Sequence, residues 1–253
     1  MSDFRPLVLV PSYNTGRDLL KSTLAGILEH SSDVMVVIDG SDDGSDTELE
    51  ETFPGLIVHR LEHNSGKGNA VLHGIGEAEQ LGFTHVLTMD ADGQHPAEWI
   101  TKFLEIGQTH PTALVLGQPI FDASAPALRV NGRKISNWWA NLETLFWGIG
   151  DSLFGMRLYP IPELKKAFAS TSGARRFDFD PEVAVRMSWQ GVPVVNLHTP
   201  VRYLTSDEGG VSQFRYLRDN VLLTRMHARL FGGFLIRVPA LLLRKRNPLR
   251  EKR

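Results

Sequence analysis

Two carboxylates one residue apart open the stretch of this 253-residue chain that is richest in chemistry. Asp90 and Asp92 follow an apolar run, 84–89, and precede a glycine, Gln94 and His95. Residues i and i+2 of an extended chain face the same side, so both carboxylates are able to point at one cation. Hard oxygen ligands suit Mg²⁺ or Mn²⁺, which also bind phosphate oxygens. The alternative is a solvated Asp-x-Asp-Gly turn, because motifs this short also occur by chance.

The elements that must position these carboxylates are strand–loop–helix units. Short apolar runs without polar alternation are typical of parallel strands that are buried on both faces. They predict strands at 7–10, 34–38, 57–61 and 85–89, and a fifth strand near 113–118. Each of the first four ends in a polar loop that contains glycine. Ligands of open α/β sheets bind outside the carboxyl ends of the strands, so we expect one site formed by these four loops.

The third loop has features of a phosphate contact. Its sequence, Asn-Ser-Gly-Lys-Gly at 64–68, offers backbone N–H groups near a helix N-terminus together with the ammonium of Lys67. It lacks the glycine spacing and the Ser or Thr of a Walker A loop, and no Gly-x-Gly-x-x-Gly follows the first strand. A helix-entry turn without a ligand is the alternative.

Composition narrows the class of protein. Hydrophobic residues make up 42% and charged residues 22%, with a net charge of −2, which fits a globular protein without a bias toward nucleic acids. The absence of cysteine excludes disulfides and thiolate chemistry. With no signal-peptide pattern and no uninterrupted apolar run of about 18 residues, we expect a cytoplasmic protein without a spanning helix. We predict one α/β domain at 1–215 and a helical, basic extension at 216–253.

The extension combines an apolar segment, 230–243, with a basic cluster, 244–253. This combination favours peripheral contact with an anionic membrane, at the inner face of the cytoplasmic membrane. The aromatic stretch 138–147 favours the same contact. The alternative is a helix packed on its own domain, with the aromatic residues in the core. Gly232-Gly233 and Pro239 predict that the segment does not form a long regular helix.

The four loops, in this order, resemble those of family 2 glycosyltransferases, and most closely the dolichol-phosphate mannose synthase-like branch. The resemblance covers roughly residues 5–210. It implies a GT-A (Rossmann-like) fold with a mostly parallel sheet flanked by helices. It further implies an inverting glycosyltransferase of the hexosyltransferase type, a UDP- or GDP-sugar donor, and Mg²⁺ or Mn²⁺. The motifs that carry it are Pro11-x-Tyr13-Asn14, Asp39-Gly40-Ser41-x-Asp43-Gly44, Asn64-x-Gly66-Lys67-Gly68 and Asp90-Ala91-Asp92-Gly93-Gln94-His95-Pro96.

The resemblance also implies roles for the donor-side residues. Asp92 and Gln94 would bind the cation, and Asp90 would approach the ribose or the cation. Lys67 would lie beside the nucleotide. The other nucleotide-sugar contacts implied by position are Pro11, Tyr13, Asn14, Asp39 and Ala91.

On the acceptor side, the segment 177–186 resembles the acidic motif of the family. It implies that Asp180 is the base that takes the acceptor proton, with Asp178 as the second choice. An acidic cluster that favours the start of a helix is the alternative. Arg202 would close over a donor or acceptor phosphate, and the segment 208–212 resembles the glycine-serine stretch that follows. An acceptor that is already a lipid phosphate would need no base.

The chain departs from the family pattern at three places. Ile38 replaces a frequent aspartate, Gln118 replaces a common arginine after Gly117, and appended transmembrane helices are missing. Weaker phosphate candidates, mostly expected to be solvated, are Arg129, Arg133, Arg157, Arg175 and Arg176.

We therefore predict metal-dependent transfer of a sugar to a lipid or lipid-linked acceptor such as a polyprenyl phosphate. Two alternatives are a glycosyltransferase with a soluble saccharide or small-molecule acceptor and a non-catalytic nucleotide-sugar-binding protein. A sugar nucleotidyltransferase is disfavoured, because the first loop lacks the glycine-rich, basic signature of that class.

Overall fold

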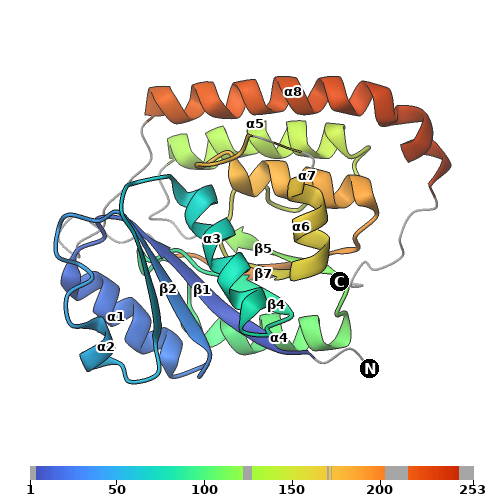
Figure 1. The fold of residues 1–253 in the computed structure, drawn as a ribbon. Helices are drawn as coiled ribbons and strands as arrows, with labels where there is room; N and C mark the ends of the chain where they lie inside the picture. Colours follow the sequence, from blue (N-terminus) through green and yellow to red (C-terminus); the bar gives the residue numbers. More distant parts are fainter. Residues whose placement is uncertain (1–3, 122–126, 170, 172, 203–215, 245–253) are drawn as a thin grey trace.

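A seven-stranded sheet forms the centre of the computed structural model, which describes residues 4–121, 127–169, 171, 173–202 and 216–244 (Figure 1). The strand order is β3-β2-β1-β4-β6-β5-β7. Strand β6 is antiparallel to both of its neighbours, and the other pairs are parallel. The strands are β1 (Pro6–Ser12), β2 (Val34–Asp39), β3 (Ile57–Leu61), β4 (His85–Thr88), β5 (Leu114–Ile120), β6 (Arg157–Pro160) and β7 (Val194–Pro200).

Helices cover both faces of this sheet, and the sheet separates the hydrophobic core into two halves. Helices α1 and α4 pack on one face, and α3, α6 and α7 pack on the other. In β1, Leu7 and Leu9 point to the α3 side, whereas Val8 and Val10 point to the α1 side. Burial on both faces explains the unbroken apolar runs and confirms the predicted parallel strands. These helices are α1 (Arg17–Leu28), α3 (Lys67–Gln80), α4 (Ile100–Thr109), α6 (Ile161–Ala169) and α7 (Phe179–Gln190), with short helices α2 (Leu49–Thr52) and η1 (Ala97–Trp99) between strands.

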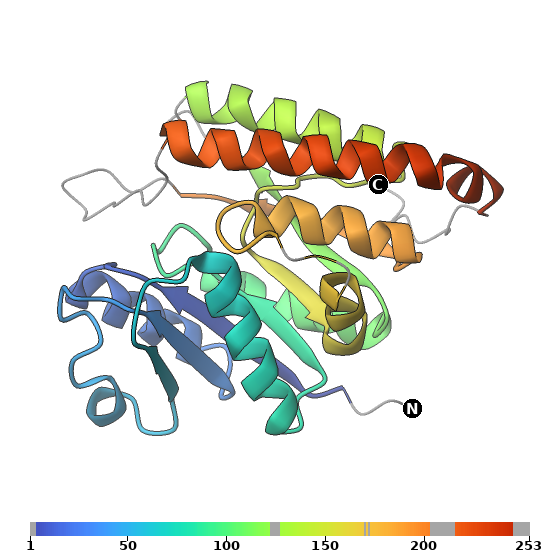
Figure 2. The same ribbon diagram turned by 45° about the horizontal axis from the view of Figure 1, so that its top comes forward.

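Helices α5 (Ala127–Glu143) and α8 (Tyr216–Leu243) lie side by side and form a further layer over α7 (Figure 2). A buried hydrogen bond joins them, with His227 Nδ1 3.1 Å from Glu143 Oε1. The indole of Trp189, on α7, donates to the carbonyl oxygen of Glu143 at 2.7 Å. Helix α8 is thus packed against α5 and α7.

Helix α8 differs from its sequence prediction in two ways. It runs for 28 residues through the glycine pair and Pro239, so the expectation of an interrupted helix is wrong. A buried stripe of Met226, Leu230, Phe234 and Leu241 explains this, because tertiary packing of one face outweighs helix propensity. The portion Leu217–Leu243 is also long and apolar enough to cross a membrane by length and composition, a test that packed helices of soluble proteins pass as well.

Candidate functional site

The loops after β1 and β2 are tied together by side chains of both. The side-chain amide of Asn14 donates from Nδ2 to Asp42 Oδ1 at 2.7 Å, and its Oδ1 accepts from the backbone N–H of Asp42 at 3.0 Å. Asp43 Oδ2 accepts from the N–H of Gly16 at 2.8 Å. Asn14 has a φ of +44°, a conformation that asparagine tolerates better than most residues. The segment with Pro11, Tyr13 and Asn14 is therefore fixed against the second loop.

Asp39 ties the second loop to the third. Its side chain is buried, and Oδ1 accepts from the N–H and the hydroxyl of Ser65 at 2.8 and 2.7 Å. Oδ2 accepts from the N–H of Gly66 at 2.8 Å. A carboxylate of the protein thus occupies these donors at the start of α3, where an anion is favoured. The N–H groups of Ser65 and Gly66 therefore bind a side chain of the protein itself, which fits the alternative of a helix-entry turn.

The start of α3 packs backbone to backbone against the segment before α7. A Cβ on Gly68 would lie 2.5 Å from the carbonyl oxygen of Ala174 and 2.8 Å from the carbonyl carbon of Arg175. The N–H of Asn69 donates to the carbonyl oxygen of Arg175 at 3.1 Å. The glycines on either side of Lys67 therefore permit a close approach between two parts of the chain.

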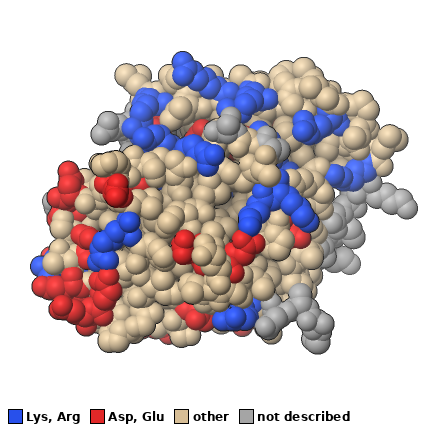
Figure 3. All heavy atoms as spheres, viewed as in Figure 1, with Lys and Arg blue, Asp and Glu red and all other residues tan. Residues whose placement is uncertain are grey.

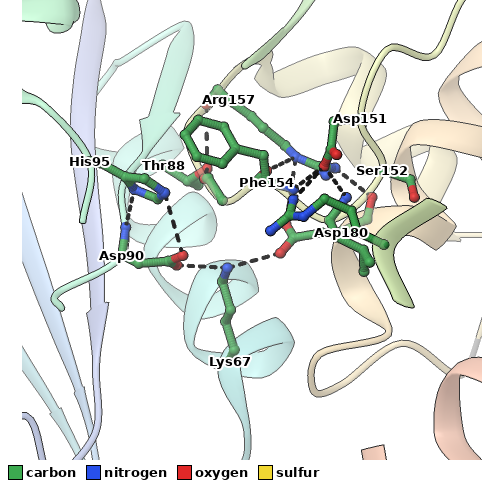
Figure 4. A network of polar contacts seen from close by, with 12 residues as sticks. Lys67, Thr88, Asp90, His95, Asp151, Ser152, Phe154, Arg157 and Asp180 are labelled. Atoms are coloured by element: carbon green, nitrogen blue, oxygen red, sulfur yellow. Dashed lines mark hydrogen bonds and ion pairs between the residues drawn. The ribbon is translucent and has the colours of Figure 1, made fainter. Parts of the chain in front are cut away.

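This approach places Lys67 between two carboxylates from opposite sides of the site (Figure 4). Its Nζ lies 2.7 Å from Asp90 Oδ1, after β4, and 2.9 Å from Asp180 Oδ2, in the first turn of α7. The structure thus brings together residues that the sequence analysis assigned to the nucleotide, the cation and the acceptor.

The ion pairs keep Lys67 and Asp90 charged. Burial by itself disfavours the Lys67 ammonium, but attraction to Asp180 and Asp90 outweighs burial and raises its pKa. Burial likewise disfavours the Asp90 carboxylate, yet Lys67, and to a smaller degree His95, lower its pKa. Lys67 and Asp90 therefore form a charged ion pair, and Asp180 lies against the same ammonium.

His95 has a role that the sequence analysis did not assign. Its Nδ1 accepts from the N–H of Asp90 at 3.0 Å, which leaves the proton on Nε2, 3.7 Å from Asp90 Oδ2. Its ring contacts that of Phe154 edge to face. Burial, only partly offset by Asp90, lowers the pKa of His95 from 6.5 to about 4, so the imidazole is neutral at pH 7. Its place five residues after Asp90 was the available signal.

Arg157 is the second residue whose role became visible only in the structure. Expected to be solvated, it is fully buried beside Asp180 (Figure 4). Its Nε donates to the carbonyl oxygen of Phe154 at 2.6 Å and its Nη1 to that of Asp180 at 2.5 Å. Nε also lies 4.0 Å from Asp180 Oδ1. The guanidinium therefore holds the start of α7 and adds a second cation beside the Asp180 carboxylate.

Asp178 and Asp180 occupy different surroundings. Asp178 precedes α7, where its Oδ1 accepts from the N–H of Arg176 at 3.0 Å. It makes no side-chain capping bond to the helix. The structure thus brings Asp180, rather than Asp178, to Lys67 and Asp90.

The loop that carries the expected cation ligands also meets Arg202. The N–H of Gln94 donates to Asp92 Oδ1 at 3.1 Å, which closes a tight turn. The carbonyl oxygen of Gln94 accepts from the N–H of Arg202 at 3.2 Å. The predicted segment 208–212 lies outside the described residues. The late arginine is therefore positioned beside the expected cation site.

The donor set of this loop fits a hard divalent cation. Asp92 and Gln94 supply oxygen donors on a partly exposed loop, and Asp90 is next to them. Within the described ranges, no three His, Cys, Asp or Glu side chains converge on a metal site. A cation here would take its remaining ligands from phosphate oxygens and water, as Mg²⁺ commonly does.

Comparison with known proteins agrees with this geometry. Residues 7–162 match the model of the family described as glycosyl transferase family 2. The chain is 26% identical to an undecaprenyl-phosphate mannosyltransferase of Micrococcus luteus, over 81% of this chain and 86% of that protein. It is 29% identical to a polyprenol monophosphomannose synthase of Mycolicibacterium smegmatis, over 83% and 80%. These relatives confirm the resemblance to the dolichol-phosphate mannose synthase-like branch.

Solved structures confirm the fold. A crystal structure of glucosyl-3-phosphoglycerate synthase from Mycobacterium tuberculosis, in complex with Mn²⁺, UDP and glucosyl-3-phosphoglycerate, superposes with a TM-score of 0.65. It covers 92% of this chain and 80% of that protein at 15% sequence identity. The predicted GT-A fold is therefore confirmed.

Proposed function

The chain belongs to glycosyl transferase family 2, and on this premise we propose that it transfers a sugar from a nucleotide-diphosphate sugar to a polyprenyl phosphate or a similar lipid-linked acceptor. The observation that carries the proposal is the Lys67 bridge between Asp90 and Asp180, which joins a donor side to an acceptor side. The names of the relatives, which specify undecaprenyl phosphate and polyprenol, support the lipid acceptor.

On the donor side, the first two loops bind the nucleoside and the β4–α4 loop binds the diphosphate. Asp92 and Gln94, with Asp90, would hold Mg²⁺ or Mn²⁺. When bound, such a cation stabilises the charge that develops on the leaving diphosphate. Lys67 adds a positive charge on the same side. The remaining donor contacts in this proposal are Pro11, Tyr13, Asn14 and Ala91, and Asp39 holds the third loop in place beside them.

On the acceptor side, a phosphate oxygen of the lipid attacks the anomeric carbon as the bond to the diphosphate breaks, which inverts the configuration. An anionic phosphate has no proton to lose, so the reaction requires no base. The burial of Asp180 and its pairing with Lys67 and Arg157 support this route. A hydroxyl acceptor would instead need Asp180 as the base. Arg202 is exposed beside the cation loop and would bind a phosphate.

The outer helices supply a surface for peripheral contact with a membrane. On α5 and α8, the exposed apolar side chains include Ile135, Trp138, Leu235, Ile236 and Leu242. Exposed basic residues lie among them, and in Figure 3 basic residues gather along the top of the view, whereas the largest cluster of acidic residues lies at the lower left. This separation of charge supports an orientation with α5 and α8 toward anionic lipid. The basic residues are Lys134, Arg218, Arg225, Arg229 and Arg237.

The test is transfer of labelled sugar from UDP- and GDP-sugars to polyprenyl phosphate in detergent with Mn²⁺, followed by organic extraction. We expect Asp92→Ala to lower turnover at least about 100-fold, because the leaving group loses its cation. The matched control is Asp33→Ala. Asp33 is an exposed acid directly before β2, at the edge of the sheet away from the site, and its substitution should keep full turnover.

Each other outcome contradicts a stated part of the proposal. Turnover that survives in a folded Asp92→Ala variant contradicts the cation role. Transfer to soluble saccharides alone contradicts the lipid acceptor. Donor binding without transfer to any acceptor identifies a non-catalytic binding protein.

A further inference from the structure

The Lys67 ammonium is bound to the Asp90 carboxylate, which is also an expected ligand of the divalent cation. Its Nζ is 2.7 Å from Asp90 Oδ1, and Asp90 is two residues from Asp92 on the expected cation loop. An ammonium and a divalent cation on one carboxylate repel each other strongly at such distances. Lys67 and the cation therefore cannot both bind Asp90 without cost.

The surroundings of Asp90 leave the carboxylate little freedom to avoid this conflict. A Cβ on Gly155 would overlap the Asp90 carboxylate, so the backbone closes one side. Thr88 Oγ1 donates to the carbonyl oxygen of Gly155 at 2.8 Å and fixes that backbone. His95 binds the Asp90 N–H from another side. The group that is able to move is the Lys67 side chain.

The Lys67 ammonium is able to keep its ion pair with Asp180 when it moves away from Asp90. The Asp180 side chain is 6% exposed, whereas that of Asp90 is 30% exposed, so a cation from solvent reaches Asp90 first. Arg157 holds the backbone of Asp180 in place by donating to its carbonyl oxygen. The ammonium thus loses one partner and keeps the other, by changes in side-chain torsions alone.

We propose that Lys67 is a built-in competitor of the divalent cation at Asp90, displaced toward Asp180 when the cation binds. This inference rests on the proposed function, because it requires a cation at Asp92 and Gln94. It assigns Lys67 a positioning role: before the donor arrives, Lys67 holds the cation loop and the start of α7 together in place of the metal. Cation binding then loosens that link, and the ammonium stays paired with Asp180.

The test measures Mn²⁺ affinity without nucleotide, from the free-Mn²⁺ electron paramagnetic resonance signal. We expect Lys67→Met to bind Mn²⁺ at least about tenfold more tightly than wild type, because the competing charge is gone. The matched control, Lys165→Met, removes an exposed lysine that pairs with Glu79 away from the site, and should change affinity less than about twofold. Affinity in Lys67→Met that equals or falls below wild type would overturn the inference.

A second variant separates displacement from a general effect of charge. In Asp180→Asn, Lys67 has Asp90 as its remaining carboxylate, so Mn²⁺ should bind more weakly than to wild type. In the Lys67→Met background the same change should have much less effect, since the ammonium that couples the sites is absent. Equal effects in both backgrounds would contradict the coupling. If Lys67→Met does not fold, as judged by circular dichroism, Lys67→Gln replaces it with a neutral donor.

Addition of UDP or GDP distinguishes this inference from the proposed function. If wild type and every variant fail to bind Mn²⁺ even with nucleotide, the metal role in the proposed function fails, and the inference fails with it. If wild type binds Mn²⁺ and Asp92→Ala does not, the metal role stands. The comparison of Lys67→Met with wild type then decides the inference alone.

Discussion

The acidic residues of the site differ in their partners, and these partners separate their roles. Asp39 accepts three hydrogen bonds from the next loop and positions α3. Asp180 is buried between Lys67 and Arg157. Asp92 closes a tight turn on a partly exposed loop, and we propose it as a cation ligand. Residue type alone did not separate an anchor from a ligand.

At the scale of single residues, His95 makes the stability of the protein depend on pH. Its folded-state pKa of about 4 lies below the ordinary value of 6.5, so between these values the unfolded chain binds the proton that the folded protein excludes. Stability is therefore lost as pH falls from about 6.5 to 4, by up to about 3 kcal/mol from this residue. Urea unfolding at pH 7, 5.5 and 4, followed by tryptophan fluorescence, measures the loss.

His95→Phe isolates this contribution. The variant leaves the Asp90 N–H without its acceptor, so at pH 7 we expect a loss of about 1–3 kcal/mol. Its stability should fall less than that of wild type between pH 7 and 4, because the titrating group is gone. Parallel pH profiles for the two proteins would show that His95 does not titrate as described.

At the scale of elements, the start of α3 is where the donor half and the acceptor half of the protein meet. Gly68 lies against the backbone of 174–175, whereas Gly76, two turns later in the same helix, has open space where a Cβ would point. The two glycines therefore differ in the space around the position that a Cβ would occupy.

Alanine at these two positions should have opposite effects. Gly68→Ala forces the backbones apart, which should destabilise the protein by about 1–3 kcal/mol and lower turnover by shifting Lys67. Gly76→Ala should be neutral or stabilising by up to about 1 kcal/mol, through helix propensity. Urea unfolding and the transfer assay measure both effects. A loss of stability in Gly76→Ala equal to that in Gly68→Ala would refute the role of the close contact.

At the scale of the whole molecule, the outer layer of α5 and α8 combines apolar and basic exposed residues (Figure 3). Removal of residues 230–253 is a poor test of this surface, because Leu230, Phe234 and Leu241 are buried and the truncation would damage the core. Point substitutions at exposed positions test it without that damage.

Ile236→Asp should weaken binding to anionic vesicles in a flotation assay. Ile236 is 80% exposed on α8, and the change removes apolar area and adds a repulsive charge, so we expect a decrease of at least about fivefold. Leu81→Asp, at the end of α3, is the control with the same chemistry and should bind like wild type. Wild type should also bind less at high salt. Equal binding of both variants would contradict the proposed orientation.

Much of the fold was predictable from local pattern. The unbroken apolar runs correctly predicted the parallel strands β1 to β4 and the strand β5, and the loops between them indicated one edge as the site. Strands β6 and β7 and the course of α8 were not predicted in this way. Strand β6 is short and antiparallel, and α8 continues through residues that disfavour helix, because packing against α5 and α7 decides its course.

The sequence by itself determined which residue types stand at the strand ends and in what order, because strand period, turn residues and loop motifs are properties of neighbouring residues. The tertiary structure alone decided that Lys67 meets Asp180, 113 residues away, and that Arg157 is buried beside Asp180. It also decided that the Asp39 carboxylate accepts hydrogen bonds from the loop after β3. Such pairings depend on sheet order and on the close approach at Gly68, and no local pattern records either of them.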